Sequence, residues 1–362
     1  MQEMEAIALR LHEAISAGFA PWSAERFEQI ALDLYSAQLE NIPSYRSYCR
    51  AVLGDAQAVD CWQEIPPVPV AAFKHRTIGT GVSPITERRT TGGNGSGCGR
   101  ISYGATGASL LSIATDLSTR QFLFPDGRAT RILALAPSPE SLPGHVLPGL
   151  MKNWIEDFGQ DGSRFLVDEH GVDLGAFRHA CEDSETKGTP LTLLGSSFGI
   201  VNLLERLDLI DLRYLLANRS RLADSGGFKG RSRMVSYPDL CTAVAATLGI
   251  EPRYCVNFWS LAEVGSLCFD NVLRNNTPHP RHKVPPPWLK IRVLDPETGA
   301  ELPDGRVGLL QVLDLTHLDH PASILTDDLG RSNASGAFLV DGKANTASTP
   351  VLKRLLGQYL RA

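Results

Sequence analysis

A glycine-rich run, Thr90 to Arg100, is the segment of this sequence best suited to contact phosphate. It reads Thr90-Thr-Gly-Gly-Asn-Gly-Ser-Gly-Cys-Gly-Arg100. Glycine permits close backbone approach and positive φ, so such a loop can turn N–H groups and hydroxyls toward phosphate oxygens. The run lacks the Gly-Lys-Ser/Thr ending of a P-loop and the strict Gly-x-Gly-x-x-Gly spacing. From the residues alone, a phosphate loop and an ordinary surface loop are both compatible with it.

A second candidate is Gly195-Ser-Ser-Phe-Gly199, which matches the Gly-x-Ser-x-Gly nucleophile elbow of α/β-hydrolases. It follows a strand-like run and precedes a helix-like stretch from Ile200 to Leu207, and Ser197 would be the nucleophile. No oxyanion signature such as His-Gly-Gly-Gly precedes it, and so short a pattern often arises by chance. We therefore favour a tight strand-to-helix turn and keep a serine hydrolase as the alternative.

Histidines and cysteines offer a weaker signal for metal chemistry. His279 and His282 lie in a proline-rich loop without helical register, and His317 and His320 follow farther along the chain. Zinc requires three or four protein ligands of fixed geometry. The 7 cysteines show no Cys-x-x-Cys spacing, so we expect reduced core thiols and loop histidines rather than a metal cage or a disulfide framework.

The composition of the chain indicates a folded globular protein around these residues. Its 362 residues suffice for two domains or one large domain with an appendage, and 43% are hydrophobic and 21% charged. The net charge of −5 without a Lys/Arg-rich run argues against a nucleic acid or anionic lipid as partner. The start, Met1-Gln-Glu-Met-Glu, is acidic where a signal peptide is basic, and no apolar run approaches a bilayer span. We expect a cytoplasmic protein with no membrane span.

Residues 1–64 are predicted to form a helical N-terminal segment, because apolar residues recur at helical spacing and Ser23 can cap the second helix. The spaced residues are Ile7, Leu11, Ala14 and Ile15 in the first helix and Phe27, Ile30, Ala31 and Leu34 in the second.

The remaining chain is predicted to comprise three further parts. Residues 65–277 form an α/β core, which begins at the break Ile65-Pro-Pro-Val-Pro and alternates short apolar runs with helix-like stretches; these runs are 131–136, 191–194 and 254–258. Residues 278–330 form a β subdomain with two alternating runs, 289–294 and 307–313. Residues 331–362 form a short C-terminal segment, whose helix starts at Thr349-Pro350.

Two further segments resemble motifs of the adenylate-forming superfamily. Asn257-Phe-Trp-Ser-Leu-Ala-Glu263 is similar to Asn-x-Tyr-Gly-x-Thr-Glu, in which the aromatic ring lies near adenine and the glutamate coordinates Mg²⁺. The stretch from Ile324 to Gly330 resembles Tyr-Arg-Thr-Gly-Asp-Leu, whose aspartate holds the ribose hydroxyls. The resemblance thus implies nucleotide contacts from Asn257 and Trp259, a metal and catalytic role for Glu263, and a ribose contact from Asp328.

The glycine-rich run resembles the superfamily's phosphate loop in position and character. That resemblance assigns phosphate contacts to the hydroxyl, amide and glycine residues at its start, which are Thr90, Thr91, Gly92, Gly93, Asn94, Gly95 and Ser96.

Nearly the whole chain resembles the acyl-protein synthetases of bacterial bioluminescence, the long-chain-fatty-acid luciferin-component ligase family. The segments that carry this resemblance are 27–48, 65–69 with 73–74, 225–231, 288–293, 314–315 and 323–330. It places Gly226 and Gly227 against adenine and directs Lys229 toward phosphate as a catalytic residue. The fold it implies is an adenylate-forming-enzyme-like N-terminal α/β domain with a helical N-terminal segment, a β subdomain and a reduced C-terminal lid.

The chain departs from these families at several positions. The superfamily threonine before the metal-binding glutamate is Ala262 here, its glycine is Ser260, and the Gly-Arg after the ribose aspartate is Gly342-Lys343, which makes Lys343 the nucleotide contact. The synthetases carry an acyl-accepting cysteine in an Arg-Gly-Cys-Ser segment near the C-terminus. This chain reads Asn345-Thr-Ala-Ser-Thr-Pro350 there, with no cysteine after Cys268.

The sequence therefore predicts an ATP- and Mg²⁺-dependent ligase that converts a small carboxylic acid, fatty or otherwise acyl or aryl, to an acyl-adenylate with release of pyrophosphate. A single glutamate suffices for Mg²⁺, which keeps phosphate and water oxygens as further ligands. The acyl group would pass to a separate acceptor, namely coenzyme A, a carrier-protein thiol or an amine. Two alternatives stay open: the serine hydrolase at Ser197, and an inactive nucleotide- or acyl-binding partner subunit.

Overall fold

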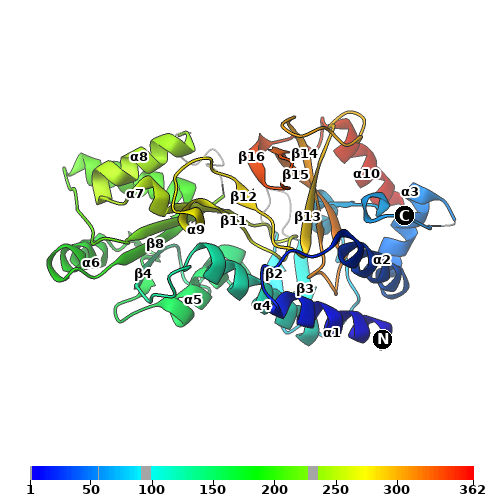
Figure 1. Ribbon diagram of the computed structural model, residues 1–362, viewed down its shortest axis with the longest axis horizontal. Coiled ribbons are helices and arrows are strands. Elements are labelled where there is room, and N and C mark those ends of the chain that lie inside the picture. Colours follow the sequence, from blue (N-terminus) through cyan, green and yellow to red (C-terminus); the bar gives the residue numbers. More distant parts are fainter. Residues whose placement is uncertain (1, 56, 91–98, 227–234) are drawn as a thin grey trace. The chain divides into compact units, whose positions relative to one another are not determined.

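The computed structural model describes residues 2–55, 57–90, 99–226 and 235–362 of the chain (Figure 1). Two compact units make up the chain. Unit 1 comprises Met1–Ser118, Leu261–Cys268 and Lys283–Ala362, and unit 2 comprises Thr119–Ser260 and Phe269–His282. The chain thus leaves unit 1 twice and returns to it twice. The short return, residues 261–268, carries Glu263.

Unit 2 is built on five parallel strands in the order β10-β9-β8-β4-β5. Strand β11 lies next to β10, on the side away from β9. Their bounds are β4 Arg131–Leu135, β5 Arg164–Phe165, β8 Leu191–Ser196, β9 Arg221–Ser225, β10 Cys255–Trp259 and β11 Cys268–Asp270. The central strands are buried along nearly their whole length. Near-continuous burial is typical of a parallel sheet covered by helices on both faces.

Helices lie on both faces of these strands, with α7 and α8 on one side and α5 on the other (Figure 1). The helices of this unit are α5 Val146–Phe158, α6 Leu174–Lys187, α7 Ser197–Leu209, α8 Tyr237–Leu248 and α9 Val272–Asn275, and the last turn of α4, Ala105–Phe122, also enters it. Side chains of Asp173, Ser196 and Ser236 cap α6, α7 and α8 by accepting first-turn N–H groups.

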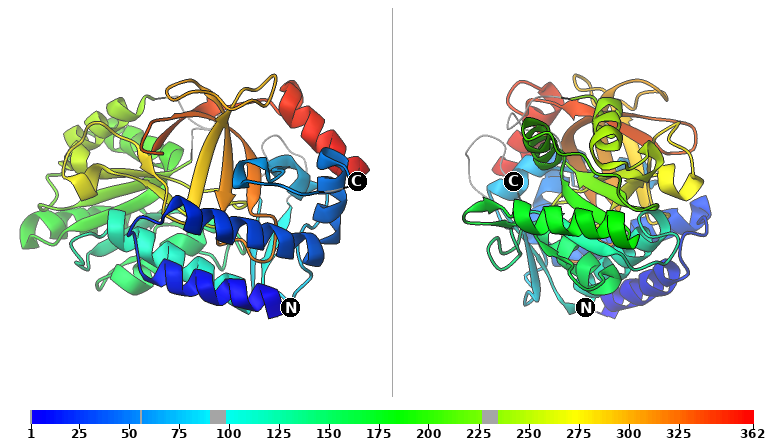
Figure 2. Two further views of the ribbon diagram at one scale, coloured as in Figure 1. Left: turned by 45° about the vertical axis from the view of Figure 1, so that its right-hand side comes forward. Right: turned by 90° about the vertical axis from the view of Figure 1, so that its left-hand side faces the viewer.

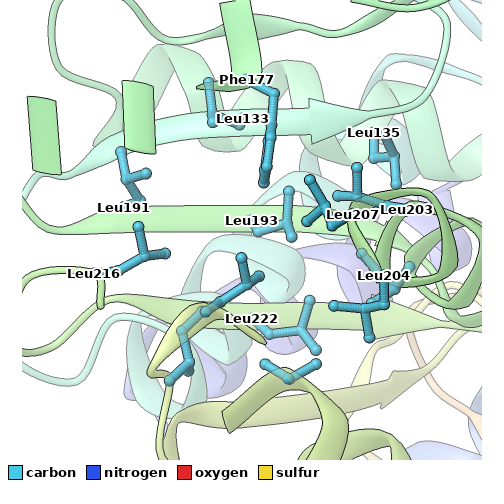
Figure 3. Close-up of a cluster of buried hydrophobic side chains, with 14 of the residues drawn as sticks. Leu133, Leu135, Phe177, Leu191, Leu193, Leu203, Leu204, Leu207, Leu216 and Leu222 are labelled. Atoms are coloured by element: carbon cyan, nitrogen blue, oxygen red, sulfur yellow. The ribbon is translucent and has the colours of Figure 1, made fainter. Parts of the chain in front are cut away.

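Leucines form the core between one face of the sheet and the helices (Figure 3). Leu133, Leu193 and Leu222 are direct neighbours on three adjacent strands. Leu203 and Leu207 of α7 and Phe177 of α6 belong to the same cluster. This packing fixes the first residues of α7, where Ser197 lies, relative to the ends of β8 and β9.

Unit 1 contains an antiparallel ladder in the order β13-β14-β15-β16, with β12 next to β16 and the short β1 parallel to β15. The bounds are β1 Val68–Pro69, β12 Lys283–Val284, β13 Leu289–Leu294, β14 Gly308–Asp314, β15 Ser323–Ser332 and β16 Phe338–Lys343. A separate hairpin, β2 Thr86–Arg89 and β3 Arg100–Tyr103, flanks the glycine-rich run.

Helices α1 Gln2–Ser16, α2 Ala24–Asn41, α3 Pro43–Leu53 and α10 Pro350–Arg361, together with α4 up to Ser118, complete unit 1. Ser23 caps α2 by accepting the Arg26 N–H at 3.2 Å. The C-terminal helix α10 lies beside α3 (Figure 2), and the rings of Tyr48 and Tyr359 meet there with centroids 5.4 Å apart. The short elements of the two units are η1 Trp62–Glu64, η2 Val70–Lys74, β6 Val167–Asp168, β7 Gly171–Val172 and η3 Pro252–Tyr254.

The predicted elements are confirmed in outline. Both N-terminal helices bury the residues expected from their spacing, the predicted parallel and antiparallel strands lie within two residues of their expected bounds, and the α/β class holds. Thr349 precedes α10 as predicted, but its Oγ1 donates to the Asn345 carbonyl instead of capping the helix. In the described part of the chain no helix is long and apolar enough to cross a membrane. The four-part division at residues 64, 277 and 330 stays a prediction.

The leucine core of unit 2 gives a first prediction. Leu193→Ala, at a side chain only 2% exposed, should lower the free energy of unfolding by about 2–5 kcal/mol because it leaves a cavity among packed neighbours. Leu209→Ala removes the same atoms at an 86% exposed position of the same unit and should change it by less than about 0.5 kcal/mol. Urea unfolding followed by circular dichroism measures both. Equal shifts in the two variants would contradict this description of the core.

Candidate active site

Glu263 is a buried carboxylate on the short return of the chain through unit 1, with 7% of its surface exposed. Burial raises its pKa to about 7, and the negative charge of Asp327 acts in the same direction. Lys74 and Lys343 oppose this rise with their positive charges. The carboxylate therefore lies in surroundings that supply less positive charge than it needs when ionised.

Asp328 and Lys343 meet directly across the β15–β16 ladder. The register pairs the two residues, and Lys343 Nζ lies 3.0 Å from Asp328 Oδ1 and 2.6 Å from Asp327 Oδ1. Burial disfavours the ammonium, but Asp328 and Asp327 outweigh it and raise the pKa of Lys343. Three residues predicted from separate motifs, Glu263, Asp328 and Lys343, thus lie in one electrostatic cluster of unit 1, while their individual roles stay predictions.

The turn after Glu263 is held by polar side chains at three successive residues. Arg88 donates to the Val264 carbonyl at 3.2 Å, His317 Nε2 accepts the Gly265 N–H at 2.7 Å, and Asp314 accepts the Ser266 N–H at 2.7 Å. Burial lowers the pKa of His317. His317 and His320 lie in the loop between β14 and β15, as predicted, but both are fully buried, with ring centroids 4.1 Å apart.

Thr90 closes the base of the glycine-rich run. Its Oγ1 accepts the Gly99 N–H at 2.8 Å, and its own N–H donates to the Gly99 carbonyl. A Cβ at Gly99 would lie 2.0 Å from the Phe73 carbonyl oxygen, so only glycine fits there. The predicted phosphate residues Thr91 to Ser96, together with Gly227 and Lys229, lie outside the described residues.

In unit 2, Asp224 near the end of β9 accepts hydrogen bonds from three side chains, of which Asn257 is a predicted nucleotide contact. Asn257 Nδ2 donates to its Oδ2 at 3.0 Å, Tyr237 Oη donates to its Oδ1 at 2.7 Å, and Ser197 Oγ lies 2.6 Å from its Oδ2. Gly226, also predicted against adenine, offers its carbonyl to Ser197 at 2.6 Å and has a φ of +75°. Asn257 and Gly226 thus share one hydrogen-bond network at the ends of adjacent parallel strands.

Trp259, the predicted adenine neighbour, lies at the end of β10 and is 6% exposed. Ser260, which replaces the superfamily glycine, has its Oγ 3.3 Å from that of Ser225.

Ser197 does not have the surroundings of a hydrolase nucleophile. Its hydrogen-bond partners in the described residues are the Asp224 carboxylate and the Gly226 carbonyl, and neither is an imidazole nitrogen. The flanking glycines have a packing reason, since a Cβ at Gly195 would lie 2.8 Å from Ile200 Cδ1 and one at Gly199 would lie 3.0 Å from the capping Ser196 Oγ. The motif is therefore a strand-to-helix turn.

Within the described residues, no group of three or more His, Cys, Asp or Glu side chains is placed to hold a metal ion. Sequence reasoning assigned no role in this cluster to Lys74, Asp327, Asp314, Arg88 and His317, although Lys74 and Asp314 lie in segments of the family resemblance and His317 was expected in a loop. Asp327 directly precedes the predicted Asp328, so its position was a usable signal. The others reach the cluster only through contacts distant in sequence.

The fold of this chain is similar to that of ligases with solved structures. It is similar to 2-hydroxyisobutyryl-CoA ligase in an open conformation, with a TM-score of 0.62, 13% identity, and coverage of 90% of this chain and 76% of that one. The same ligase in its postadenylation state gives a TM-score of 0.61 at 15% identity, covering 90% and 69%. The comparison with ATP-bound MatB from Rhodopseudomonas palustris gives a TM-score of 0.46 at 15% identity. It covers 72% of this chain and 48% of MatB, so the chain spans about half the length of that protein.

Residues 114–354 match the family described as acyl-protein synthetase, LuxE, and the chain belongs to this family. It is 22% identical over 320 residues to the long-chain-fatty-acid–luciferin-component ligase of Vibrio harveyi, covering 85% of this chain and 81% of the relative. A second relative of that name, from Aliivibrio fischeri, is 24% identical over 171 residues, covering 46% and 43%. The predicted resemblance is confirmed. Membership also confirms the predicted class of activity, a ligase that activates an acid and passes on the acyl group, and favours neither alternative.

The buried carboxylate predicts a pH-dependent effect on stability. The pKa of Glu263 is about 7 in the folded protein against 4.5 when unperturbed, so the folded state binds the extra proton and the wild type loses stability as the pH rises through this window. Glutamine has no charge to bury. In Mg²⁺-free buffer, Glu263→Gln should therefore exceed the wild-type free energy of unfolding by about 2–3 kcal/mol at pH 8 and by less than about 1 kcal/mol at pH 5.

Urea unfolding at the two pH values measures this difference, and Glu156→Gln, at an exposed position, controls for the loss of one surface charge. A gain that is the same at both pH values would show that the Glu263 carboxylate does not titrate in this window.

Proposed function

We propose that this chain uses ATP and Mg²⁺ to activate a carboxylic acid as its acyl-adenylate and then transfers the acyl group to a separate acceptor. The observation that carries the proposal is the buried Glu263 carboxylate, whose pKa is raised to about 7, in a cluster with the Asp328–Lys343 pair. Both belong to a chain of the acyl-protein synthetase family. The name of the two bioluminescence relatives supports a long-chain fatty acid as the first substrate class to test.

The chemistry explains why such a cluster is needed. A carboxylate is a poor electrophile because attack adds to an anion and expels an oxide-like leaving group. Attack of its oxygen on the α-phosphorus of ATP forms the acyl-adenylate and releases pyrophosphate, and a nucleophile can then displace AMP from the carbonyl carbon. The first step requires the α-phosphate, the ribose and the departing pyrophosphate to be held in line.

Named residues supply each of these functions in the proposal. Asp328 accepts hydrogen bonds from the ribose hydroxyls while Lys343, its ion-pair partner, orients the carboxylate. The run from Thr90 to Ser96, with Lys229, binds the phosphates. Asn257, Trp259, Gly226 and Gly227 surround the adenine, and the network centred on Asp224 supports the orientation of Asn257.

The electrostatic surroundings of the Glu263 carboxylate suit a bound divalent cation. Its two cationic neighbours, Lys74 and Lys343, leave its pKa raised, and Lys343 is shared with two aspartates. A hard cation that takes one or two carboxylates matches this demand. Bound there, Mg²⁺ would neutralise charge on the α-phosphate.

The first test is ATP–pyrophosphate exchange over a panel of fatty and aromatic acids. Wild-type protein should exchange in a manner that requires both Mg²⁺ and an acid, and Glu263→Gln should lower the rate roughly 10²-fold or more, since it removes one preorganised charge contact. Glu156→Gln should match the wild type. Wild-type rates in Glu263→Gln would disprove the metal role, and no exchange with any acid by the folded wild type would favour the inactive subunit.

The second test concerns the acceptor, which we propose to be a separate thiol or amine rather than a cysteine of residues 1–362. A thiolate is the reactive form of cysteine, and burial raises the pKa of Cys49 and Cys181 to about 12 and that of Cys268 still higher. A hydrogen bond with Cys255 lowers the pKa of the buried Cys241, which makes Cys241 the first cysteine to examine if label is found. Protein incubated with ATP and radiolabelled acid, then denatured, should carry no label that neutral hydroxylamine releases. Stoichiometric hydroxylamine-labile label would show an acyl-enzyme thioester and overturn this proposal; peptide mapping would then identify the cysteine.

A further inference from the structure

We propose that His317 is a positioning residue for Glu263. Its Nε2 accepts the Gly265 N–H at 2.7 Å and so fixes the turn, Val264 to Ser266, that carries the carboxylate. The inference deepens the proposed function and rests on it, because Glu263 is the metal ligand there.

The imidazole is held at both nitrogens, and this defines its protonation. His317 Nδ1 lies 3.1 Å from the Pro321 carbonyl oxygen, and Nε2 faces the Gly265 amide. A carbonyl oxygen only accepts and an amide N–H only donates, so the proton is on Nδ1 and the lone pair on Nε2. The ring is fully buried and stacks on that of His320, with planes 24° apart. It is therefore a fixed acceptor for one backbone amide.

The turn and His317 fit each other closely. A Cβ at Gly265 would lie 2.4 Å from Thr316 Oγ1 and 3.2 Å from atoms of the His317 ring, so glycine is required for the approach. Arg88 and Asp314 hold the residues on either side of Gly265. Because these two anchors stay in place without His317, its loss should leave the turn attached but free to rotate about its middle residue.

Such a rotation would act on Glu263 in particular. The carboxylate lies two residues before Gly265 and is buried beside Asp327, Lys74 and Lys343, whose charges shift its pKa. Coordination and in-line attack depend on placement to within a fraction of an ångström, and small displacements are costly in rate. We therefore expect the Gly265 hydrogen bond to matter for use of Mg²⁺ more than for folding.

Two substitutions separate the two sides of the ring. His317→Gln can place an amide oxygen near Nε2 and keep an acceptor for Gly265, whereas His317→Asn reaches only the Nδ1 position and keeps the donor to Pro321. His320→Leu is the control for packing, because both nitrogens of that buried ring lack a hydrogen-bond partner in the described residues.

The experiment measures pyrophosphate exchange against Mg²⁺ concentration and hydrogen exchange of the 261–268 peptide, with and without Mg·ATP. His317→Asn should lower kcat about 10–100-fold, raise the half-saturating Mg²⁺ concentration and speed exchange at Gly265. His317→Gln should stay within about fivefold of the wild type, and His320→Leu should change stability without changing the Mg²⁺ dependence.

Several results would overturn the proposal. Equal losses in His317→Asn and His317→Gln, or a Mg²⁺ dependence unchanged in His317→Asn, would reduce His317 to a packing role. If His317→Asn does not fold, the wild type still decides, since a Gly265 amide that exchanges as fast as an open loop would disprove the hydrogen bond. Failure of the proposed function is recognised separately: the wild type would then show no Mg·ATP-dependent protection or exchange, whichever variant is compared.

Discussion

The buried charge of Glu263 is the constraint on which the rest of the site depends. Moving a carboxylate out of water disfavours its ionised form, and here the pKa rises to about 7 despite two lysines nearby. A protein selected for stability alone would place a neutral side chain at this position. A site that must attract a cation benefits from an unmet negative charge, so the predicted loss of stability with rising pH and the proposed chemistry would have the same origin.

The fold supplies the partners of this carboxylate through chain topology and strand register. The chain returns to unit 1 for residues 261–268, which puts Glu263 in the same unit as β15 and β16. Within that ladder, Asp328 faces Lys343. The ammonium of Lys343 also reaches the neighbouring Asp327, so this register brings one cation to two successive carboxylates. The antiparallel ladder of unit 1 is thus as necessary to the cluster as the motif residues themselves.

The sequence allowed much of the fold but only part of the site to be predicted. The fold depends mostly on residues close in the chain, whereas the site depends on contacts between residues far apart in the chain. Apolar periodicity identified α1, α2 and the buried strands, because these patterns depend on neighbours in the chain. Asp328 and Lys343 were found through motifs. Lys74, Arg88 and His317 were not placed in the cluster, because each lies far from Glu263 in the sequence. The sequence pattern around them does not indicate the contact.

Ser197 and His317 show why local patterns mislead about chemistry. Ser197 lies in a motif known for nucleophiles, but its hydroxyl faces a carboxylate and a carbonyl, and a backbone carbonyl cannot serve as its base. His317 lies in no motif, yet its ring nitrogen Nε2 accepts the amide N–H of Gly265, in the middle of the turn that follows Glu263. In both cases the side chain's role follows from which partner donates and which accepts. Donors and acceptors are paired only in the folded protein, so the sequence around each residue does not reveal them. For this reason Ser197, which lies in a known motif, is not assigned a chemical role, whereas His317, which lies in none, is proposed to have one.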